Sequence, residues 1–590
     1  MVYFILLIMT NTHRTHISNL LIIGSGAAGL RAAIAAHQAG CEVVVVGKRP
    51  RRDAHTVLAA GGINAALGTV DPEDTWQQHF ADTFEEAYHL SNTRMVEIMV
   101  KESPAEVLQL ADWGAKFARL PDGSLDQRFF GAHTYRRTCY AGDYTGREII
   151  HTLDRKVAEL GILVIENQYV SRLLVAGGVC FGAFGFDIMT GARTVYLADA
   201  VVLAAGGHTR LWRRSSSRRD ENTGDGIYLG LQAGAKLMDM ELVQFHPSGM
   251  VTPEDWAGTL VTEAVRGEGG VLHNKDGERF MQRYDPERLE LSTRDRVAMA
   301  VYTEIIEGRG TPNGGVYLDI SHRSKEYILE KLPRMYRQFL EAQMLDISRQ
   351  PMEVAPTAHY SMGGVVVDPD TTATAVEGLY AAGEVTAGLH GANRLGGNSL
   401  AETLVFGRRA GEHAALRSLS LTHTWRDPEA IQAAHAELDT LIRPGSQLTR
   451  PLQRALRDTM WENCGVVRAE GRLTRGLQRI AELKEQACDV DVRPSSEGYK
   501  DLVIALDLHR GLVVAEATLL GAQMRRESRG AHARSDFPHL DPALTGNLII
   551  RQGEDNGLYA TYQPAPPIPE AFRPFLEKRT ELALAGRLLE

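Results

Sequence analysis

The chain has 590 residues, of which 44% are hydrophobic and 23% are charged. This composition is typical of a globular protein with an ample core and two to four domains. The net charge of −10 gives no reason to expect nucleic acid as a partner. The five cysteines show no C-x-x-C pair and no metal-ligand spacing, which fits a reducing compartment. We therefore expect no metal site and no iron–sulfur cluster held by this chain itself.

Residues 1–9 form an apolar run, MVYFILLIM, that is too short to span a bilayer. The run lacks the basic start and the small-residue cleavage site of a signal peptide. We expect an upstream start codon, with the working chain beginning near Met9. No other segment looks like a membrane span, so we expect no direct transmembrane segment.

Residues 20–46 predict a nucleotide-binding start. The apolar runs 20–23 and 42–46 suit buried strands, and the alanine-rich segment 30–39 between them suits a helix. The loop before that helix is a G-x-G-x-x-G. In this motif Gly24 permits a tight turn, Gly26 lets the backbone approach a pyrophosphate, and Gly29 allows close packing of helix on strand. The N–H groups and the positive dipole end of the helix would then hold the phosphates.

The second predicted strand is followed by Gly47 and Lys48, where a dinucleotide site usually places Asp or Glu on the adenosine ribose. The absence of that acid argues against ordinary NAD binding. The segment EGLYAAGE ends in Glu384, which could take the missing ribose role. The small-residue loop AHTVLAAGG, residues 54–62, could pass close to a flat ring.

The remaining segments predict an α/β domain with additions. Residues 71–115 have helical spacing, residues 162–207 are rich in strand signals, and residues 427–527 are almost wholly helical, as in a bundle. The block 248–359 mixes strand and helix signals, and we interpret it as an inserted domain. The Arg- and Ser-rich loop 212–220 is interpreted as a solvated basic loop.

Four clusters of polar residues carry the candidate chemistry: QFHP (244–247), TEAVRGEGG (262–270), TRD (293–295), and His359 with HGANR (390–394). Each alone has a plain explanation as a capped loop, a surface ion pair or a hydrogen-bonded core histidine. Together they supply histidines, arginines and a relay carboxylate, which suits a small dianion. Arginine binds a carboxylate through two parallel N–H bonds, and histidine adds a directed donor. The residues are His246, His359, Arg266, Arg294, Arg394 and Glu263.

The chain resembles the flavoprotein subunit of succinate dehydrogenase and fumarate reductase from Leu20 to about Pro569. The matching motifs, in the family's order, are AHTVLAAGG, RTCYAGDYTG, NTGDG, QFHPSG, TEAVRGEGG, TRD, PTAHYSMGG, GLYAAGE, HGANRLGGNSL and ESRGAH. The resemblance implies an α/β fold class. Its expected parts are a Rossmann-like FAD-binding domain (15–247 and 360–421), an inserted α+β capping domain (248–359), a helical domain (422–536) and a small C-terminal region (537–590).

The resemblance also implies roles for matching positions. FAD is the implied cofactor, with His55 as its covalent 8α-histidyl attachment. Further FAD contacts are implied at Gly24, Gly26, Gly29, Lys48, Thr56, Gly61, Gly62, Asp225, Glu384, Ser399 and Leu400. The implied dicarboxylate ligands are His246, Thr262, His359 and Arg394, with the ring of Phe117 packed on the substrate. Arg294 matches the residue that exchanges a proton with substrate, with Glu263 and Arg266 as the relay behind it. An arginine is otherwise locked in its protonated form.

The activity implied by the resemblance is the interconversion of succinate and fumarate by hydride transfer with FAD. The implied partners are an iron–sulfur subunit, with a membrane anchor and a quinone reached through it. These partners would place the chain in the cytoplasm, peripherally on the cytoplasmic face of a membrane.

Three positions depart from the family pattern. Ala54 replaces the serine before the flavin-linking histidine, and Ser248 replaces a threonine but keeps a hydroxyl. Ala60 stands where succinate oxidisers often carry Gln and some fumarate reducers carry Glu. The physiological direction therefore stays open.

Two alternatives are weighed against this interpretation. L-Aspartate oxidase is a close relative that works without an iron–sulfur partner and lacks the flavin-linking histidine. It carries a Glu that can pair with the substrate ammonium where this chain has Phe130. A phenyl ring offers no counter-charge, so Phe130 favours succinate or fumarate. The second alternative, a catalytically silent flavoprotein scaffold, is disfavoured by the intact set His246, Arg294, His359 and Arg394.

Overall fold

A seven-stranded sheet lies at the centre of the structure, which is a computed structural model describing residues 14–495 and 498–577. Five of its strands run parallel, and the other two extend it as an antiparallel meander beside β9. Their order is β6-β2-β1-β9-β8-β7, with β16 also paired to β9. The strands are β1 (Arg14–Ile23), β2 (Val43–Val46), β6 (Leu163–Ile165), β7 (Gln168–Ala176), β8 (Val179–Asp187), β9 (Arg193–Leu203) and β16 (Leu379–Ala381).

The parallel strands β1 and β2 end in runs of Leu, Ile and Val that are buried throughout, as expected for a sheet covered on both faces. The predicted strands at 20–23 and 42–46 are confirmed, as is the strand-rich character of 162–207. The expected start of the working chain near Met9 lies outside the described residues.

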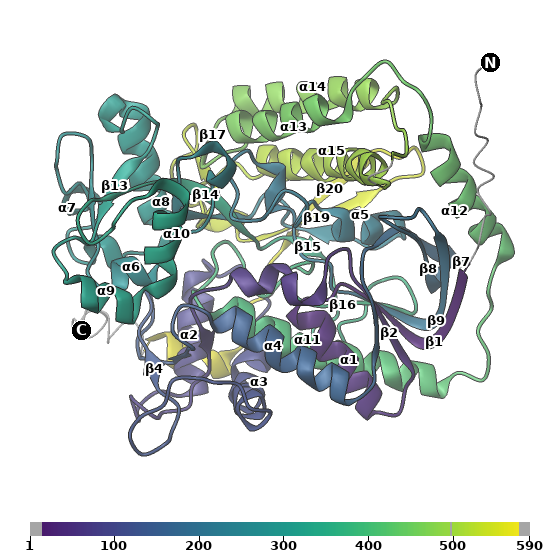
Figure 1. The fold of residues 1–590 in the computed structure, drawn as a ribbon, viewed down its shortest axis with the longest axis horizontal. Helices are drawn as coiled ribbons and strands as arrows, with labels where there is room; N and C mark the ends of the chain where they lie inside the picture. The colour runs from purple at the N-terminus through teal and green to yellow at the C-terminus, as the bar shows by residue number, and fades with distance from the viewer. Residues whose placement is uncertain (1–13, 496–497, 578–590) are drawn as a thin grey trace.

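Helices α1 (Ala27–Gln38) and α11 (Asn398–Ser420) pack together against β1 and β9 (Figure 1). Their close approach depends on two glycines, because a Cβ at Gly407 would lie 2.6 Å from the Ala28 carbonyl oxygen and one at Gly411 would lie 2.2 Å from that of Ala32. The same layer contains α2 (Trp76–Glu86), α3 (Thr93–Asp112) and α4 (Thr145–Glu159), so the helical prediction for 71–115 is confirmed.

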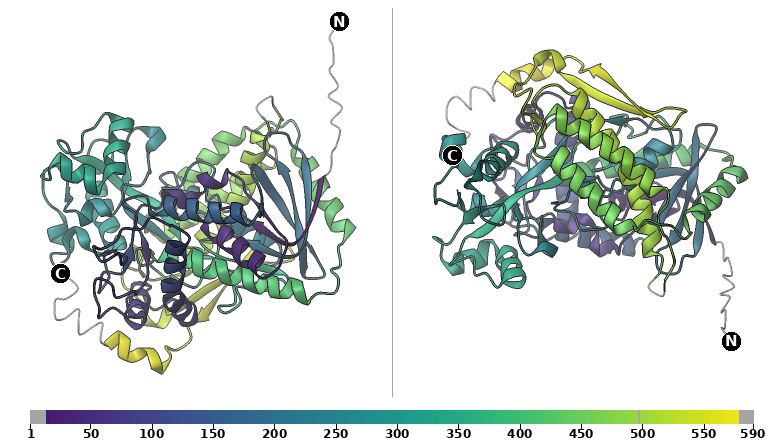
Figure 2. Two further views of the ribbon diagram at one scale, coloured as in Figure 1. Left: turned by 60° about the horizontal axis from the view of Figure 1, so that its bottom comes forward. Right: turned by 90° about the horizontal axis from the view of Figure 1, so that it is seen from above.

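The inserted block folds around its own hydrophobic core and projects from one end of the molecule (Figures 1 and 2). Its four-stranded sheet has the order β11-β14-β13-β12. The long strands β11 and β14 contain the expected boundaries 247/248 and 359/360. They therefore run from the domain built on the central sheet into the inserted block, which is called the cap below. The elements are β11 (Val243–Met250), β12 (Val271–His273), β13 (Val316–Asp319), β14 (Met352–Ser361), α6 (Ala264–Gly267), α7 (Met281–Tyr284), α8 (Arg294–Glu304), α9 (Lys325–Lys331) and α10 (Pro333–Gln343).

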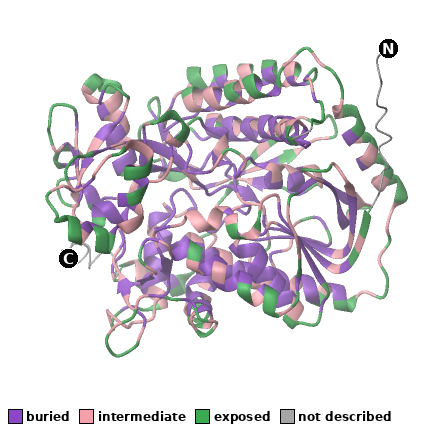
Figure 3. Cartoon of the chain, in the orientation of Figure 1, coloured by how far each residue is buried: buried purple, intermediate pink, exposed green. Residues whose placement is uncertain are grey.

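The predicted helical bundle is confirmed. Helix α15 lies against α13 and α14, and it is buried along most of its length (Figure 3). Because its apolar residues surround the helix, α15 also packs on α5 (Asp225–Gln232) of the domain built on the central sheet. The bundle helices are α13 (Thr449–Asn463), α14 (Glu470–Ala487) and α15 (Lys500–Met524), whereas α12 (Pro428–Leu441), the first helix of the predicted stretch, packs on β7.

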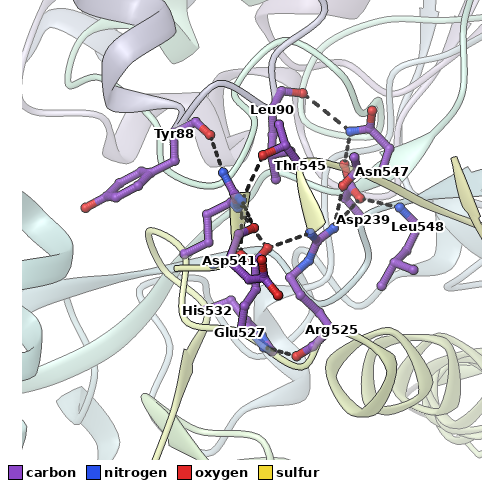
Figure 4. A network of polar contacts seen from close by, with 12 residues as sticks. Tyr88, Leu90, Asp239, Arg525, Glu527, His532, Asp541, Thr545, Asn547 and Leu548 are labelled. Atoms are coloured by element: carbon purple, nitrogen blue, oxygen red, sulfur yellow. Dashed lines mark hydrogen bonds and ion pairs between the residues drawn. The ribbon is translucent and has the colours of Figure 1, made fainter. Parts of the chain in front are cut away.

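The C-terminal hairpin of β19 (Gly546–Gln552) and β20 (Leu558–Pro564) joins a sheet with β10 (Leu237–Met238) and β15 (Gly364–Val365). A buried ionic network, drawn in Figure 4, holds this junction together. Arg525 bonds Glu241 at 2.6 Å and Asp239 at 3.1 Å, and the Asp239 carboxylate also accepts from the backbone of Leu548. These bonds connect the segment after α15 to Asp239 and Glu241 of the domain built on the central sheet.

A search of the described residues for a membrane-spanning helix finds no candidate of sufficient length and hydropathy. The longest helix, α15, carries five charged side chains and is accounted for by its packing inside the bundle.

Candidate active site

The carboxyl ends of the parallel strands meet along one wall of a cavity of about 250 Å³. Gly24 follows β1, Lys48 follows β2, Ala204 follows β9, and Glu384 follows β16. This edge of an open α/β sheet is where ligands bind. The cap closes over it, because β11, β14 and the first residue of α8 contribute His246, His359 and Arg294 to the lining.

All but three of the residues predicted from the sequence line this cavity. They are Gly24, Gly26, Lys48, His55, Thr56, Gly61, Gly62, Asp225, His246, Thr262, Glu263, Arg294, His359, Glu384, Arg394, Ser399 and Leu400. Gly29 and Arg266 lie directly behind the lining, against Gly24 and Glu263 respectively.

The third exception, Phe117, is a correction. Its ring is buried in the hydrophobic core under the sheet and does not line the cavity. The ring on the cavity wall belongs to Phe130, thirteen residues later, which is 5% exposed and touches the loop at Gly61 and Gly396. The sequence offers three phenylalanines here, at 117, 129 and 130, and only the tertiary path of the segment distinguishes them.

The glycine loop borders the space in which a ligand would lie. Its turn has no room for a side chain larger than a hydrogen atom. Gly24 has φ +117°, and a Cβ there would lie 2.1 Å from the Ala204 carbonyl oxygen. A Cβ at Gly29 would lie 1.9 Å from the Gly24 carbonyl oxygen. Helix α1 begins directly after Gly26, which has no side chain to cap it. The Ala27 N–H donates to Thr56 Oγ1 at 3.3 Å. The first turn of α1 lines the cavity with its positive dipole end, and the residues present fit the pyrophosphate of a dinucleotide.

His55 lies on the cavity wall with its Nδ1 3.1 Å from Glu221 Oε2. Burial alone would lower the pKa of His55, but the bond to Glu221 raises it above its ordinary value. Burial would raise the pKa of Glu221, but His55 and Arg218 lower it to about 2. Glu221 thus holds His55 by one nitrogen and leaves Nε2 without a hydrogen-bond partner among the described residues. Glu221 was missed by the sequence reasoning, because it follows the loop interpreted as solvated.

That interpretation of residues 212–220 holds for the exposed Arg213 and Arg219 but is wrong for the rest of the loop. Trp212 is fully buried, and Ser216 and Asp220 line the cavity. The Ser216 hydroxyl lies 2.9 Å from Nδ1 of His359 and so fixes the orientation of that ring. The three serines stand in a run between two pairs of arginines and carry no hydrophobic signal, so the sequence did not show that they face inward.

The two histidines of the basic cluster face each other from neighbouring strands. His246 on β11 and His359 on β14 have ring centroids 5.2 Å apart. The backbone N–H of Ser248 donates to His246 Nδ1 at 3.3 Å. Burial lowers the pKa of both rings well below the ordinary value, with Arg294 adding to the effect at His246 and His246 adding to it at His359. Both rings are therefore neutral near pH 7 in the absence of a bound anion.

Two arginines share one neutral acceptor beside these histidines. Gln244 Oε1 accepts from Arg394 Nη2 at 3.0 Å and from Arg294 Nη1 at 3.2 Å. Arg394 also donates to Ser399 Oγ at 3.0 Å, and its guanidinium lies 4.3 Å from the ring centroid of Tyr360. Burial, followed by the charge of Arg294, lowers the pKa of Arg394 to about 10. Arg394 is thus a buried cation with neutral hydrogen-bond acceptors and no carboxylate partner among the described residues.

The three residues of the predicted relay lie together. Arg294 Nε donates to Glu263 Oε2 at 2.7 Å, and Arg266 Nη2 lies 3.9 Å from the same oxygen. Arg266 is fully buried and donates through Nη1 to the Glu290 carbonyl at 2.5 Å. Burial would raise the pKa of Glu263, but the charges of Arg294 and Arg266 lower it to about 2. Glu263 is therefore an ionised carboxylate between two guanidiniums.

Glu384 faces the cavity from the end of β16. Its Oε1 accepts from the Ser361 backbone N–H at 3.0 Å, and Asn222 Nδ2 lies 3.4 Å from Oε2. Burial raises the pKa of its carboxyl. The carboxyl can still accept from a hydroxyl group, and the ribose role expected from the sequence stays a prediction.

A glycine cradle for a dinucleotide and a basic pocket for a small dianion, joined in one cavity, define an FAD-binding oxidoreductase. Comparison with protein families agrees with this class. Residues 19–400 match the family described as FAD binding domain, and residues 453–564 match the one described as Fumarate reductase flavoprotein C-term. The second match spans α13 from residue 453, α14, α15 and the C-terminal hairpin together.

Similar proteins narrow the class. A fumarate reductase (CoM/CoB) subunit from Methanothermobacter marburgensis is 45% identical over 90% of this chain and 97% of its own length. The succinate dehydrogenase flavoprotein subunit of Coxiella burnetii is 37% identical over 95% and 98%. The solved structure of Mycobacterium smegmatis Sdh1 in complex with UQ1 has a TM-score of 0.86 and 41% identity over 97% and 98%. The chain belongs to the family of succinate dehydrogenase and fumarate reductase flavoprotein subunits, and the predicted fold class is confirmed.

Proposed function

We propose that this chain is the catalytic flavoprotein subunit that interconverts succinate and fumarate and passes electrons to an iron–sulfur subunit. The observation that supports this most is the convergence of four basic side chains on the cavity that also holds the glycine loop and His55. These side chains are His246, His359, Arg294 and Arg394.

In the proposed reaction the chain's own residues bind, orient and protonate. Arg394, with neutral His246 and His359 as directed donors, holds the two carboxylates of the substrate. FAD, when bound, supplies the two-electron redox chemistry. Arg294 exchanges a proton with the substrate carbon. In the reductive direction Glu263 relays a proton from Arg266 to restore Arg294, and in the oxidative direction Glu263 takes the proton from Arg294, since an arginine cannot remain deprotonated. Positioning and charge stabilisation in a water-poor cavity account for most of the rate.

The proposal includes a covalent bond between His55 and the 8α carbon of the flavin. Its support is the geometry at His55, where Glu221 occupies Nδ1 and leaves Nε2 for the bond. Precipitating the holoprotein with acid tests the linkage, and we expect the yellow colour to stay in the pellet. Flavin found wholly in the supernatant, after expression with the assembly factors of the host, would contradict it.

The electron partners and the direction are part of the proposal. Relatives of similar identity carry the names fumarate reductase and succinate dehydrogenase, and the one from Methanothermobacter marburgensis is named for CoM and CoB. The small Ala60 on the cavity wall matches neither the Gln nor the Glu associated with one direction. We propose that an iron–sulfur subunit, with a membrane anchor and quinone reached through it, holds the chain at the cytoplasmic face of a membrane.

L-Aspartate oxidase activity is the second candidate. It is disfavoured by Phe130, because the described cavity offers a phenyl ring at the position where an aspartate oxidase has a carboxylate. A substrate ammonium beside that ring would lose its hydration without gaining a partner.

The proposed function is tested by two assays on the purified chain, succinate-dependent reduction of an artificial acceptor and fumarate-dependent oxidation of a reduced dye. We expect turnover in both, and we expect an iron–sulfur subunit to copurify from the native cell. A flavin-containing protein with no turnover in either assay would support the silent scaffold instead.

A further inference from the structure

Lys48 occupies an unusual place at the end of β2. A dinucleotide fold usually has an acidic side chain here, but this chain places an ammonium group on the cavity wall beside Asp225 and Tyr169. Its Nζ lies 2.9 Å from both carboxylate oxygens of Asp507 and 3.6 Å from Asp225 Oδ2. The ammonium also lies 5.0 Å from the ring centroid of Tyr169.

Asp507 comes from a different part of the molecule. It lies on α15 of the helical bundle, is 5% exposed and does not itself line the cavity. Besides both bonds from Lys48, its Oδ1 accepts from the Tyr169 hydroxyl at 2.8 Å. One carboxylate of the bundle therefore holds two side chains that do line the cavity.

Arg510 reinforces this contact from the same face of α15, three residues further along. Its Nη1 donates to the Tyr169 hydroxyl and to the Val170 carbonyl, each at 3.1 Å. The bundle thus fixes the start of β7 as well as the end of β2, which are separate strands of the central sheet. These contacts cross the boundary between the helical bundle and the domain built on the central sheet, and they support two strands of that sheet.

The positive charge of Lys48 is compensated by neighbouring carboxylates. Burial alone would lower the pKa of Lys48, but Asp507 and Asp225 raise it above its ordinary value, so the amine stays charged. Removing the charge of Asp507 would leave the ammonium with only the more distant carboxylate of Asp225. A buried cation that loses its close partner moves toward solvent or another acceptor, and Tyr169 would lose its acceptor at the same time.

We propose that Asp507 is a positioning residue for the cofactor and shapes the part of the site that holds the adenosine half of FAD, acting through Lys48 and Tyr169. The proposal rests on the assignment of FAD to this cavity. The adenosine half is indicated by topology, because the residues after the second strand lie on the ribose side of a G-x-G-x-x-G loop. The helical bundle is thereby part of the FAD site although none of its helices lines the cavity.

The test uses the full chain with His55→Ser, so that FAD can be removed and returned. Binding of FAD, ADP and FMN to the stripped chain is measured by calorimetry, with and without Asp507→Asn. We expect FAD and ADP to bind roughly ten- to a hundredfold more weakly to the Asp507→Asn chain, while FMN, which lacks adenosine, binds as before. Lys48→Met should cause a similar loss, and the double variant should lose little more, because both changes break one interaction.

Glu516→Gln is the matched control, since it removes a carboxylate that pairs with Lys484 on the same helix but away from the cavity. It should leave all three affinities unchanged. Unchanged ADP binding in Asp507→Asn would overturn the inference, as would an equal loss for ADP and FMN, which indicates general damage. A parent chain that binds neither FAD nor ADP would instead overturn the cofactor assignment on which the inference rests.

Discussion

Two walls of the same cavity treat positive charge in opposite ways. On the basic wall, formed by His246, His359, Arg294 and Arg394, Arg294 pairs with the Glu263 carboxylate, but the Arg394 guanidinium donates to the neutral oxygen of Gln244. On the lysine wall, formed by Lys48, Tyr169 and Asp225, the single cation has two carboxylate neighbours. Among the described residues Arg394 has no ion-pair partner at all.

The basic wall therefore has a cation that is free to bind an anionic ligand, whereas the cation of the lysine wall is already paired within the protein. An unpaired buried cation is costly, so a protein retains one where an anion will arrive. A paired cation is structural and positions its neighbours. We therefore assign recognition of the dianion to the basic wall and alignment of the cofactor to the lysine wall, and the following predictions test that division.

The largest effect is expected for Arg294→Gln. This change removes the group that exchanges a proton with substrate, so kcat should fall at least about a hundredfold in both directions, while bound FAD is retained. Turnover is measured with artificial acceptors and donors, and FAD is measured by absorbance. Arg296→Gln, on the same helix but largely exposed, is the control and should keep the parent rate. A variant of Arg294 with more than about a tenth of the parent rate would assign proton transfer elsewhere.

A smaller effect is expected for Phe130→Glu, which adds a counter-charge beside the basic wall. It should raise the preference for L-aspartate over succinate by about a hundredfold, since a substrate ammonium would gain a buried partner. The measurement is the ratio of kcat/KM for the two substrates. Phe117→Leu is the control, because it alters a buried ring outside the cavity. That variant should lower the melting temperature and leave the ratio unchanged, and a shift in its ratio would restore Phe117 to the site.

The smallest effect concerns the dependence of stability on pH. The pKa of Glu263 is about 2 in the folded chain, below its value of about 4.3 in an unfolded one. Its stabilisation is thus present above about pH 4.3 and is lost as the pH falls toward 2. Of a total on the order of 3 kcal/mol, roughly half is lost between pH 5 and 3. In Glu263→Gln the unfolding free energy should fall less steeply between pH 5 and 3. Urea denaturation measures this slope, and equal slopes in the two proteins would contradict the assignment.

The basic wall was predictable from sequence because its residues stand in short motifs. These motifs contain six residues that line the cavity, namely His246, Thr262, Glu263, Arg294, His359 and Arg394. The glycine loop was predictable for the same reason, since spacing within six residues fixes its geometry. The strands and the bundle followed from their hydrophobic runs and periodicity.

The support behind both walls could not be read in this way. Asp507 is 459 residues from Lys48 in the chain, and its local sequence is that of an ordinary buried helix. Glu221 and Ser216 lie in a loop whose composition suggests solvent. These contacts depend on how distant elements dock, and a single sequence does not state that. The exchange of Phe117 for Phe130 has the same cause, because no periodicity orients an irregular segment.

The central claim is that the basic wall recognises a dianion without an ammonium group. It is tested most directly by offering succinate and L-aspartate to the unmodified chain with one artificial electron acceptor and comparing kcat/KM. The account predicts that succinate is oxidised with a kcat/KM at least about a hundredfold higher than that of L-aspartate. Efficient oxidation of L-aspartate, with succinate turned over poorly, would contradict it.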